Sequence, residues 1–348
     1  MTREIKALKS NIASKGRVSD YISLAILYGN RLEYENAARS LLCILKSNET
    51  KSTNYYNSNY RPNLQIIIPC GGNASRWDNF LSQPKHLVDV GNNTRLIERT
   101  RQQIFTHFGD QTVTLLLDKK SANKYPVLPK TGTIFKNSKK DNNVALEVLS
   151  HPEINTRLDL LWIYGDTFFT KDAFTMIAND ISRNHLKIRY YGRKHQNADY
   201  GNNGGELFAV YTPIPLLQEL KDIYLFVKRL YIGTPMYRFS SWEVIAFLSV
   251  IQKQGGIQRW RDYATTLGAT RIFTEMCSIW KDRSFPDELW VEINDATEDF
   301  DYPYEYINWL LRRAHARIST DCNKLQILDS TLNRISPPDS VDSANRIF

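Results

Sequence analysis

Residues 66–88 read IIIPCGGNASRWDNFLSQPKHLV, and this is the most informative segment of the sequence. Residues 66–69 are the second part of a continuous apolar run, Leu64–Pro69. Such a run is typical of a strand buried on both faces of a sheet. Gly71 and Gly72 follow, and glycines with small neighbours let backbone N–H groups turn inward to form a concave nest for an anion. The stretch therefore predicts a buried strand that runs into an anion-binding loop.

Two basic side chains follow this loop. Arg76 carries a planar, permanently charged fork that suits phosphate oxygens, and Lys85, stiffened by Pro84, adds a compact point charge. A Gly-Gly turn with a nearby arginine is also common as a structural feature without a ligand. The chain has neither the Walker loop nor the G-x-G-x-x-G pattern. The loop thus indicates an anion site without identifying the anion.

Strand-like and helix-like segments alternate after this first strand. Buried strands are expected at Val113–Leu117 and Leu158–Tyr164, with shorter ones near 187–192, 206–211 and 289–293. The expected helices cover 95–108, 143–149, 171–184, 240–253 and 298–314, and Ser240 with Glu243 forms a capping box. This alternation predicts an α/β fold, a mostly parallel mixed sheet flanked by helices on both faces.

The 348 residues have the composition of an ordinary globular protein, 42% of them hydrophobic, and a net charge of +8 that favours anionic partners. We expect four parts: a small N-terminal helical appendage at 1–48, a polar linker at 49–63, a large domain at 64–318 and a polar tail at 319–348. The appendage is a candidate for homo-oligomerisation.

Other patterns exclude several classes of protein. The four cysteines are far apart and form no C-x-x-C pair, which excludes a zinc ribbon and suits a reducing compartment. The chain shows no signal segment and no apolar stretch of membrane-spanning length. No RNA-binding motif accompanies the aromatic residues, so we expect no nucleic-acid partner. The sequence predicts a cytoplasmic protein.

Oxygen-bearing side chains follow two of the expected strands. Asp166 comes just after the strand at 158–164, where open α/β sheets bind their ligands, although an aspartate there is more often a helix cap or turn residue. In the late segment WVEINDATEDFD, residues 290–301, Glu292 and Asn294 are two apart and share a face, and Asp295 adds a further oxygen. Carboxylate and amide oxygens without His or Cys are the ligands that Mg²⁺ prefers.

These elements in this order resemble the nucleotidyltransferase branch of the GT-A fold, which includes sugar-phosphate nucleotidylyltransferases and choline-phosphate-type cytidylyltransferases. The family pattern is an apolar strand, A-G-x-G-[ST]-R, then P-K, a mid-chain metal-binding Asp and a late E-I-D-[DS]-x-x-D. The resemblance covers roughly residues 64–315. The chain departs from the pattern at Ala74, where the family usually has its second glycine, and at Asn294, where an aspartate is common.

The resemblance implies a Rossmann-like GT-A fold and a role for each matching residue. It implies that Arg76, Lys85 and Asp166 are the catalytic residues. Nucleotide binding would fall to Cys70, Gly71, Gly72, Asn73, Ala74, Ser75, Arg76 and Asn143. The cofactor Mg²⁺ would be held by Asp166, Glu292, Asn294 and Asp295. The acceptor would be bound by Arg193, Lys194 and Glu206.

The predicted reaction is Mg²⁺-dependent transfer of a nucleoside monophosphate from a nucleoside triphosphate to a sugar phosphate or other small phosphorylated acceptor, with CTP slightly favoured. The acceptor's phosphate oxygen would attack the α-phosphorus and expel pyrophosphate. Two alternatives stay open. A GT-A glycosyltransferase would use a finished nucleotide sugar, but it normally needs D-x-D where this chain has Gly165-Asp166-Thr167. Ala74 and Asn294 motivate the other alternative, a non-catalytic nucleotide-binding scaffold.

Overall fold

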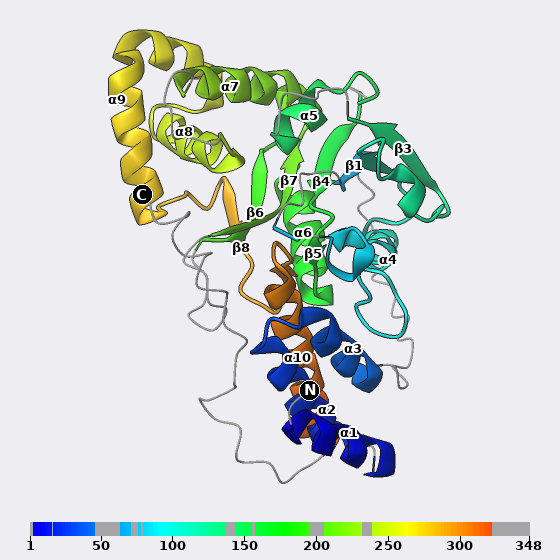
Figure 1. Ribbon diagram of the computed structural model, residues 1–348. Coiled ribbons are helices and arrows are strands. Elements are labelled where there is room, and N and C mark those ends of the chain that lie inside the picture. The colour runs from blue at the N-terminus through cyan, green and yellow to red at the C-terminus, as the bar shows by residue number, and fades with distance from the viewer. Residues whose placement is uncertain are drawn as a thin grey trace. The chain divides into compact units, whose positions relative to one another are not determined.

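The computed structural model describes residues 3–15, 17–45, 63–70, 76–77, 79–136, 143–154, 157–194, 205–231 and 239–321 (Figure 1). The chain divides into two compact units, each built from segments that are far apart in sequence. The larger unit comprises residues 55–73 and 100–297. The smaller unit comprises residues 1–54, 74–99 and 298–348.

A seven-stranded sheet forms the centre of the larger unit, in the order β3-β2-β1-β4-β7-β6-β8. Its strands are β1 Leu64–Pro69, β2 Val113–Leu117, β3 Thr131–Phe135, β4 Asp159–Ile163, β6 Arg189–Arg193, β7 Glu206–Thr212 and β8 Trp290–Glu292. Strand β7 is antiparallel to both of its neighbours, and every other pair is parallel. The predicted fold class, a Rossmann-like α/β fold with a mixed, mostly parallel sheet, is confirmed.

Strand β1 lies inside the sheet, between β2 and β4, and all six of its residues are buried. Ile66 pairs with Val113 of β2 on one side and with Leu161 of β4 on the other. From β1 the chain continues to β2 and β3 on one side and then returns to β4 on the opposite side. The order in which the strands are added to the sheet therefore reverses between the parallel strands β1 and β4, and open α/β sheets bind ligands at such a point.

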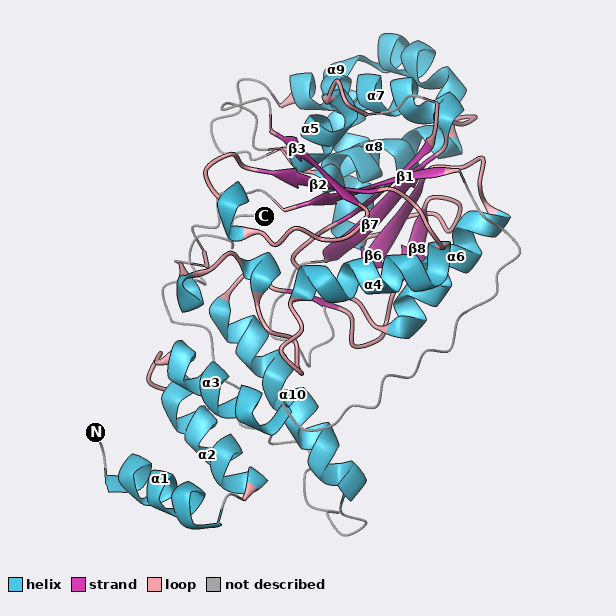
Figure 2. Ribbon diagram, turned by 90° about the vertical axis from the view of Figure 1, so that its right-hand side faces the viewer, coloured by secondary structure: helices cyan, strands magenta, loops and turns pink. Residues whose placement is uncertain are grey.

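Helices cover both faces of this sheet (Figure 2). One face carries α5 Val144–Ser150, α7 Leu217–Leu230, α8 Ser241–Lys253 and α9 Trp260–Asp282, and it shares one apolar core with the strands, including Ile67, Trp162 and Val210. The opposite face carries α6 Lys171–Arg183 and, from Thr100 on, α4 Leu96–Phe108, where the His107 and Phe174 rings stack 5.6 Å apart. Side chains that alternate along each strand supply both cores.

Local sequence signals explain where several of these helices begin. The predicted capping box at α8 is present: the Ser240 hydroxyl accepts the Trp242 N–H, and the Glu243 carboxylate accepts the Ser240 N–H at 2.7 Å. At α6, the Thr170 hydroxyl accepts the Ala173 N–H at 3.0 Å. Such caps satisfy amide groups that have no partner within the helix.

The smaller unit is helical and comprises α1 Arg3–Lys15, α2 Val18–Gly29, α3 Tyr34–Leu45 and α10 Pro303–Asp321. Helix α3 packs against both α2 and α10 through small and aliphatic side chains, among them the fully buried Ala37, Ala38 and Leu41. The helices expected within 1–48 are therefore present, but they share a unit with α10. This grouping differs from the predicted appendage at 1–48 and domain at 64–318.

Most of the predicted linker at 49–63 and of the tail at 319–348 lies outside the described residues. Short strands β5 Thr167–Phe168 and β9 Glu298–Asp299 lie outside the seven-stranded sheet. None of the described helices is both long enough and apolar enough to cross a membrane.

Candidate functional site

The carboxyl ends of six strands lie along one edge of the sheet, because β7 is the single antiparallel strand in it. Several predicted site residues of the larger unit lie at this edge. Cys70 follows β1, Asp166 follows β4, Lys194 follows β6 and Glu292 ends β8. Cys70 and Asp166 flank the reversal point between β1 and β4. Ligands of open α/β proteins bind at this edge, so the topology places these residues where a site is expected.

Gly165 allows Asp166 to lie beside the end of β1. The Gly165 N–H donates to the Pro69 carbonyl at 3.2 Å. A Cβ atom at Gly165 would lie 2.8 Å from the Cys70 Sγ and 2.9 Å from the Pro69 oxygen, closer than van der Waals contact permits. Only glycine fits this approach of β4 to β1, so Gly165 determines where the Asp166 carboxylate can lie.

The groups around Asp166 are protonated. Burial, and then the negative charge of Asp166, raise the pKa of the Cys70 thiol well above its ordinary value. The Tyr125 hydroxyl donates to the Cys70 carbonyl at 2.9 Å, and burial, Cys70 and Asp166 all raise the pKa of that hydroxyl. A neutral thiol is a poor nucleophile. The chemistry available here is therefore that of the Asp166 carboxylate and not of Cys70.

Lys136, just after β3, is a cation at the same edge that the sequence interpretation missed. Its backbone N–H donates to the Leu117 carbonyl at 3.0 Å. Partial burial lowers the pKa of its ammonium group, while the charges of Glu147 and Asp118 act in the opposite direction. Lys136 was missed because β3, the strand that it follows, was not predicted.

Asn143, predicted to contact the nucleotide, is the N-cap of α5. Its side-chain oxygen accepts the Leu146 N–H at 2.9 Å, and its amide nitrogen donates to the Phe239 carbonyl at 3.4 Å. The side chain is buried. The structure thus gives this amide a capping role at the start of α5.

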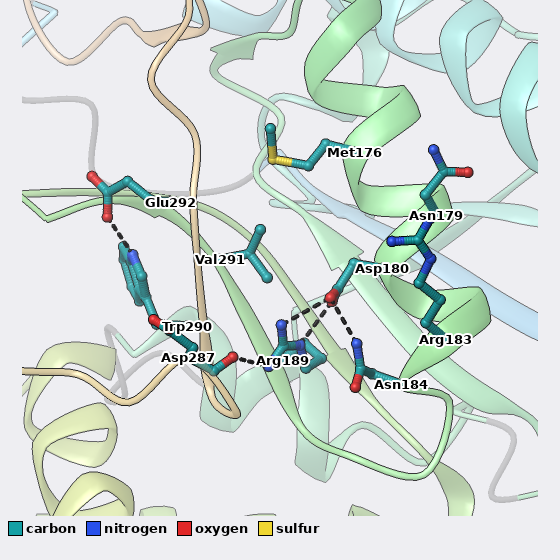
Figure 3. A pocket seen from close by; sticks show the side chains of 10 residues that line it. All are labelled: Met176, Asn179, Asp180, Arg183, Asn184, Arg189, Asp287, Trp290, Val291 and Glu292. Carbon is teal, nitrogen blue, oxygen red and sulfur yellow. Dashed lines mark hydrogen bonds and ion pairs between the residues drawn. The ribbon is translucent and has the colours of Figure 1, made fainter.

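Glu292, predicted as a metal ligand, has a donor on each oxygen. One oxygen accepts the Lys194 N–H at 2.8 Å, and the other accepts the indole N–H of Trp290 at 2.6 Å. Glu292 also lines an open pocket of about 460 Å³ along α6 and β8 (Figure 3). In the same pocket Arg189 and Asp180 form a two-pronged ion pair with distances of 2.7 and 2.8 Å.

The other oxygen donors of the late segment lie in different surroundings. Asp295 accepts the Thr297 N–H at 2.8 Å and the Thr170 hydroxyl, whereas Asn294 is exposed. Within the described residues, Asp166, Glu292 and Asp295 do not bring their carboxylate oxygens within 4.8 Å of one another as a group of three. Their joint assignment to Mg²⁺ therefore stays a prediction.

Arg193 and Glu206, predicted to bind the acceptor, form a buried ion pair with each other. The Arg193 side chain has no solvent exposure, and its Nη1 lies 2.8 Å from the Glu206 carboxylate. Its Nη2 donates to the backbone carbonyls of Asp295 and Thr297 at 2.9 and 2.7 Å. This network joins β6, β7 and the segment after β8.

In the smaller unit, the two cations predicted to bind phosphate lie together. Arg76 Nη1 is 2.8 Å from one oxygen of Asp301, and Lys85 Nζ is 3.0 Å from the other. The Arg76 guanidinium also lies over the Tyr302 ring, 5.1 Å from its centre. The sequence interpretation did not single out Asp301. Gly71–Ser75 lie outside the described residues, and a joint role of this cation pair with Asp166 stays a prediction.

No protein-family model and no curated protein sequence matches this chain. Among solved structures, the chain is similar to a protein assigned as a glucose-1-phosphate thymidylyltransferase of Bacillus anthracis, with 13% identity over 75% of this chain and 96% of the other and a TM-score of 0.42. It is also similar to the CTP:phosphocholine cytidylyltransferase of Streptococcus pneumoniae, with 12% identity over 74% and 99% and a TM-score of 0.36.

A third similar structure is described as a mannose-1-phosphate geranyltransferase of Thermus thermophilus, with 13% identity over 51% of this chain and 69% of the other and a TM-score of 0.38. Identities and TM-scores this low leave the chain's own residues to decide its function.

Proposed function

We propose that this protein is a nucleotidylyltransferase that transfers a nucleoside monophosphate from a nucleoside triphosphate to a small phosphorylated acceptor and releases pyrophosphate. One observation carries the proposal: Arg76 and Lys85, nine residues apart in sequence, contact the two oxygens of a single carboxylate, Asp301. Two cations within reach of one anionic group can engage neighbouring oxygens of a polyphosphate chain. The glycine-rich segment between β1 and Arg76 matches such a ligand.

The chemistry requires positioning and charge neutralisation and no nucleophilic side chain. The acceptor's phosphate oxygen is already anionic, so it attacks the α-phosphorus without a general base, and pyrophosphate leaves with the electron pair of the broken P–O bond. Arg76 and Lys85 would balance negative charge on the triphosphate, which is the main protein contribution to such transfers. The protonated Cys70 at the sheet edge agrees with a mechanism that forms no covalent enzyme intermediate.

The proposed cofactor is Mg²⁺, which neutralises phosphate charge when bound. The Asp166 carboxylate, at the carboxyl edge beside the reversal point, suits a hard cation. Asn294 and Asp295 would add further oxygens. Glu292 fits this role less well, because both of its oxygens already accept hydrogen bonds.

The test is pyrophosphate release from a panel of nucleoside triphosphates and phosphorylated acceptors with Mg²⁺, beginning with CTP and sugar phosphates. We expect Asp166→Asn, Arg76→Gln and Lys85→Gln each to lower turnover by a factor of about 100 or more, as loss of a charge-stabilising group does. The matched controls are Asp172→Asn, an exposed aspartate in the first turn of α6, and Arg39→Gln, an exposed arginine of α3.

Three results would contradict the proposal. Full turnover in Asp166→Asn would remove Asp166 from the site. Release of a nucleoside diphosphate from nucleotide sugars, without pyrophosphate, would identify a glycosyltransferase instead. Binding of a triphosphate without turnover for every acceptor would favour a nucleotide-binding scaffold.

A further inference from the structure

Arg283 occupies an unusual position at the end of α9. It has a left-handed backbone conformation, with a φ of 48°, and its guanidinium group lies against two tryptophan rings. The guanidinium carbon lies 4.4 Å from the centre of the Trp280 ring and 5.3 Å from that of Trp242. The two rings meet edge to face, 5.4 Å apart, and contacts with both of them restrict the orientation of the guanidinium group.

This guanidinium has no anionic partner among the described residues, and its Nη1 is buried without a hydrogen-bond acceptor. The two buried arginines of β6 differ from this half-buried one, because Arg189 pairs with Asp180 and Arg193 pairs with Glu206. Partial burial lowers the pKa of Arg283, which is the effect expected of a positive charge that is partly removed from water. An anion bound beside it would relieve this unfavourable burial.

The guanidinium lies at the same sheet edge as the candidate site residues of the larger unit. A Cβ atom at Gly205, just before β7, would be 2.5 Å from the Arg283 Nη1 and 2.8 Å from the carbonyl oxygens of Arg193 and Lys194 at the end of β6. Arg283 therefore lies directly against the backbone where β6 ends and β7 begins.

A second cation lies at this position. The Lys194 ammonium donates to the Phe285 carbonyl at 3.2 Å, and its backbone N–H is held by Glu292. The rings of Trp280, Phe285 and Trp290 all pack against Trp242 at this corner. Two of the four rings, Trp242 and Trp280, already contact a cation of the protein itself, Arg283. The chemistry left to satisfy is that of an anion with oxygens in one plane or on one face, such as a phosphate group.

We infer that Arg283, assisted by Lys194, binds the phosphate group of the small phosphorylated acceptor. The inference rests on the proposed function for the identity of the ligand, and on the uncompensated guanidinium for the site itself. Arg283 becomes a binding residue for the acceptor and takes no part in binding the triphosphate.

The first experiment titrates the full-length protein with inorganic phosphate and records tryptophan fluorescence, which reports on Arg283 because it contacts two indole rings. We expect a saturable change that is weakened roughly tenfold or more in Arg283→Gln, the loss typical of a hydrogen bond to a charged group. Arg283→Lys keeps the charge but loses the planar fork, so we expect partial weakening. Lys281→Gln, at an exposed position of the same helix, is the control for general charge loss.

The second experiment measures steady-state kinetics with the best acceptor. We expect Arg283→Gln to raise KM for the acceptor roughly tenfold or more, while KM for the triphosphate stays within twofold. Circular dichroism of each variant separates this effect from misfolding. If Arg283→Gln does not fold, the comparison of Arg283→Lys with the parent tests the inference, because this variant retains a cation against the rings.

The outcomes separate the inference from the proposed function. Turnover with an unchanged acceptor KM, or phosphate binding equal in Arg283→Gln and the parent, overturns the inference and leaves the function intact. If phosphate binding depends on Arg283 but no substrate pair is turned over, the anion site is supported and the proposed nucleotidylyltransferase function is overturned. A phosphate effect equally weakened in Lys281→Gln shows general electrostatic attraction and overturns the specific site.

Discussion

Single residues determine the local geometry at the reversal point of the sheet. Gly165 is the clearest case, because the chain after β4 passes against Cys70 and Pro69 with no space for a side chain. The residue after it, Asp166, is the carboxylate on which the candidate site depends. A substitution at Gly165 should therefore affect both stability and activity.

We predict that Gly165→Ala lowers the free energy of unfolding by about 1–3 kcal/mol, the usual effect of overpacking, and also reduces turnover by displacing Asp166. Urea denaturation and pyrophosphate release measure the two effects. The control is Gly132→Ala, where the added Cβ would lie 3.7 Å from the Thr114 hydroxyl, an ordinary contact. Equal stability of the two variants would contradict the packing argument.

The buried Cys70 thiol predicts how stability depends on pH. Because its pKa is raised in the native state, the unfolded chain loses the proton first as pH rises. The stability that the protonated, buried thiol contributes is complete at a pH below the pKa of the thiol in the unfolded chain, about 8.5. Above that pH this stability is lost, at up to about 1.4 kcal/mol per pH unit. Denaturation between about pH 8.5 and about pH 10, below the ordinary tyrosine range, should show a smaller loss in Cys70→Ala than in the parent. Cys43→Ala, at an exposed cysteine, should leave the slope unchanged.

Asp301 competes with any phosphate for Arg76 and Lys85, since it contacts both cations. We predict that Asp301→Asn tightens the binding of inorganic tripolyphosphate by roughly fivefold, or about 1 kcal/mol, because a competing charge of a partly exposed pair is removed. Calorimetry at low and high salt measures this gain, which should shrink as salt screens the charges. Glu98→Gln removes a charge elsewhere in the smaller unit and serves as control. Weaker binding in Asp301→Asn would show that Asp301 orients the cations instead.

At the scale of secondary-structure elements, the network around Arg193 joins two strands and a loop. Arg193 ends β6, Glu206 begins β7, and the carbonyls of Asp295 and Thr297 belong to the segment after β8. The family resemblance implied acceptor binding for this pair, within a stretch of sequence where charged residues cluster. The structure instead satisfies their charges within the protein.

We predict that Arg193→Met lowers the free energy of unfolding by about 3–5 kcal/mol, because it leaves the Glu206 carboxylate buried without its partner. The double variant with Arg193→Met and Glu206→Gln should recover part of the lost stability. Thermal or urea denaturation of the single and double variants measures both effects. A folded Arg193→Met of normal stability, with only the acceptor KM raised, would contradict the structural role.

Elements differed in how well their sequences predicted them. The buried strands β1 and β2 were predicted with their bounds, because both faces are covered and their sequences are continuously apolar. Strand β3 was missed, since it lies at the sheet edge and Ile134 is its single buried residue. Helix α9 was also missed. Its few buried residues give a weak helical period, and Gly268 interrupts it with a φ of 71°.

At the scale of the whole molecule, each unit is assembled from distant segments. The smaller unit joins the N-terminal helices, residues 74–99 and the C-terminal helix α10, and the larger unit contains the sheet. The predicted boundaries followed changes in composition along the chain. Composition does not show that α3 and α10 pack together, because that contact joins residues at opposite ends of the sequence.

We predict that Arg76→Gln and Lys85→Gln are strongly non-additive in kcat/KM, because both cations contact the same carboxylate, Asp301, and the proposed reaction uses both on the same triphosphate. The double variant should be about as active as the worse single variant. Steady-state kinetics of the two single variants and the double variant measure this coupling. Losses that simply multiply would show that the two residues act independently.

The sequence alone predicted the fold class and the strand that precedes the glycine-rich segment, and it singled out the cations Arg76 and Lys85. These predictions depend on hydrophobic patterns and on residue types close together in the chain. The tertiary structure decided which charged groups already have partners. It pairs Arg193 with Glu206, places Asp301 within reach of both Arg76 and Lys85, and leaves Arg283 against two tryptophans without an anion among the described residues. Whether a charge is compensated depends on contacts between residues far apart in sequence, and only the folded chain establishes those contacts.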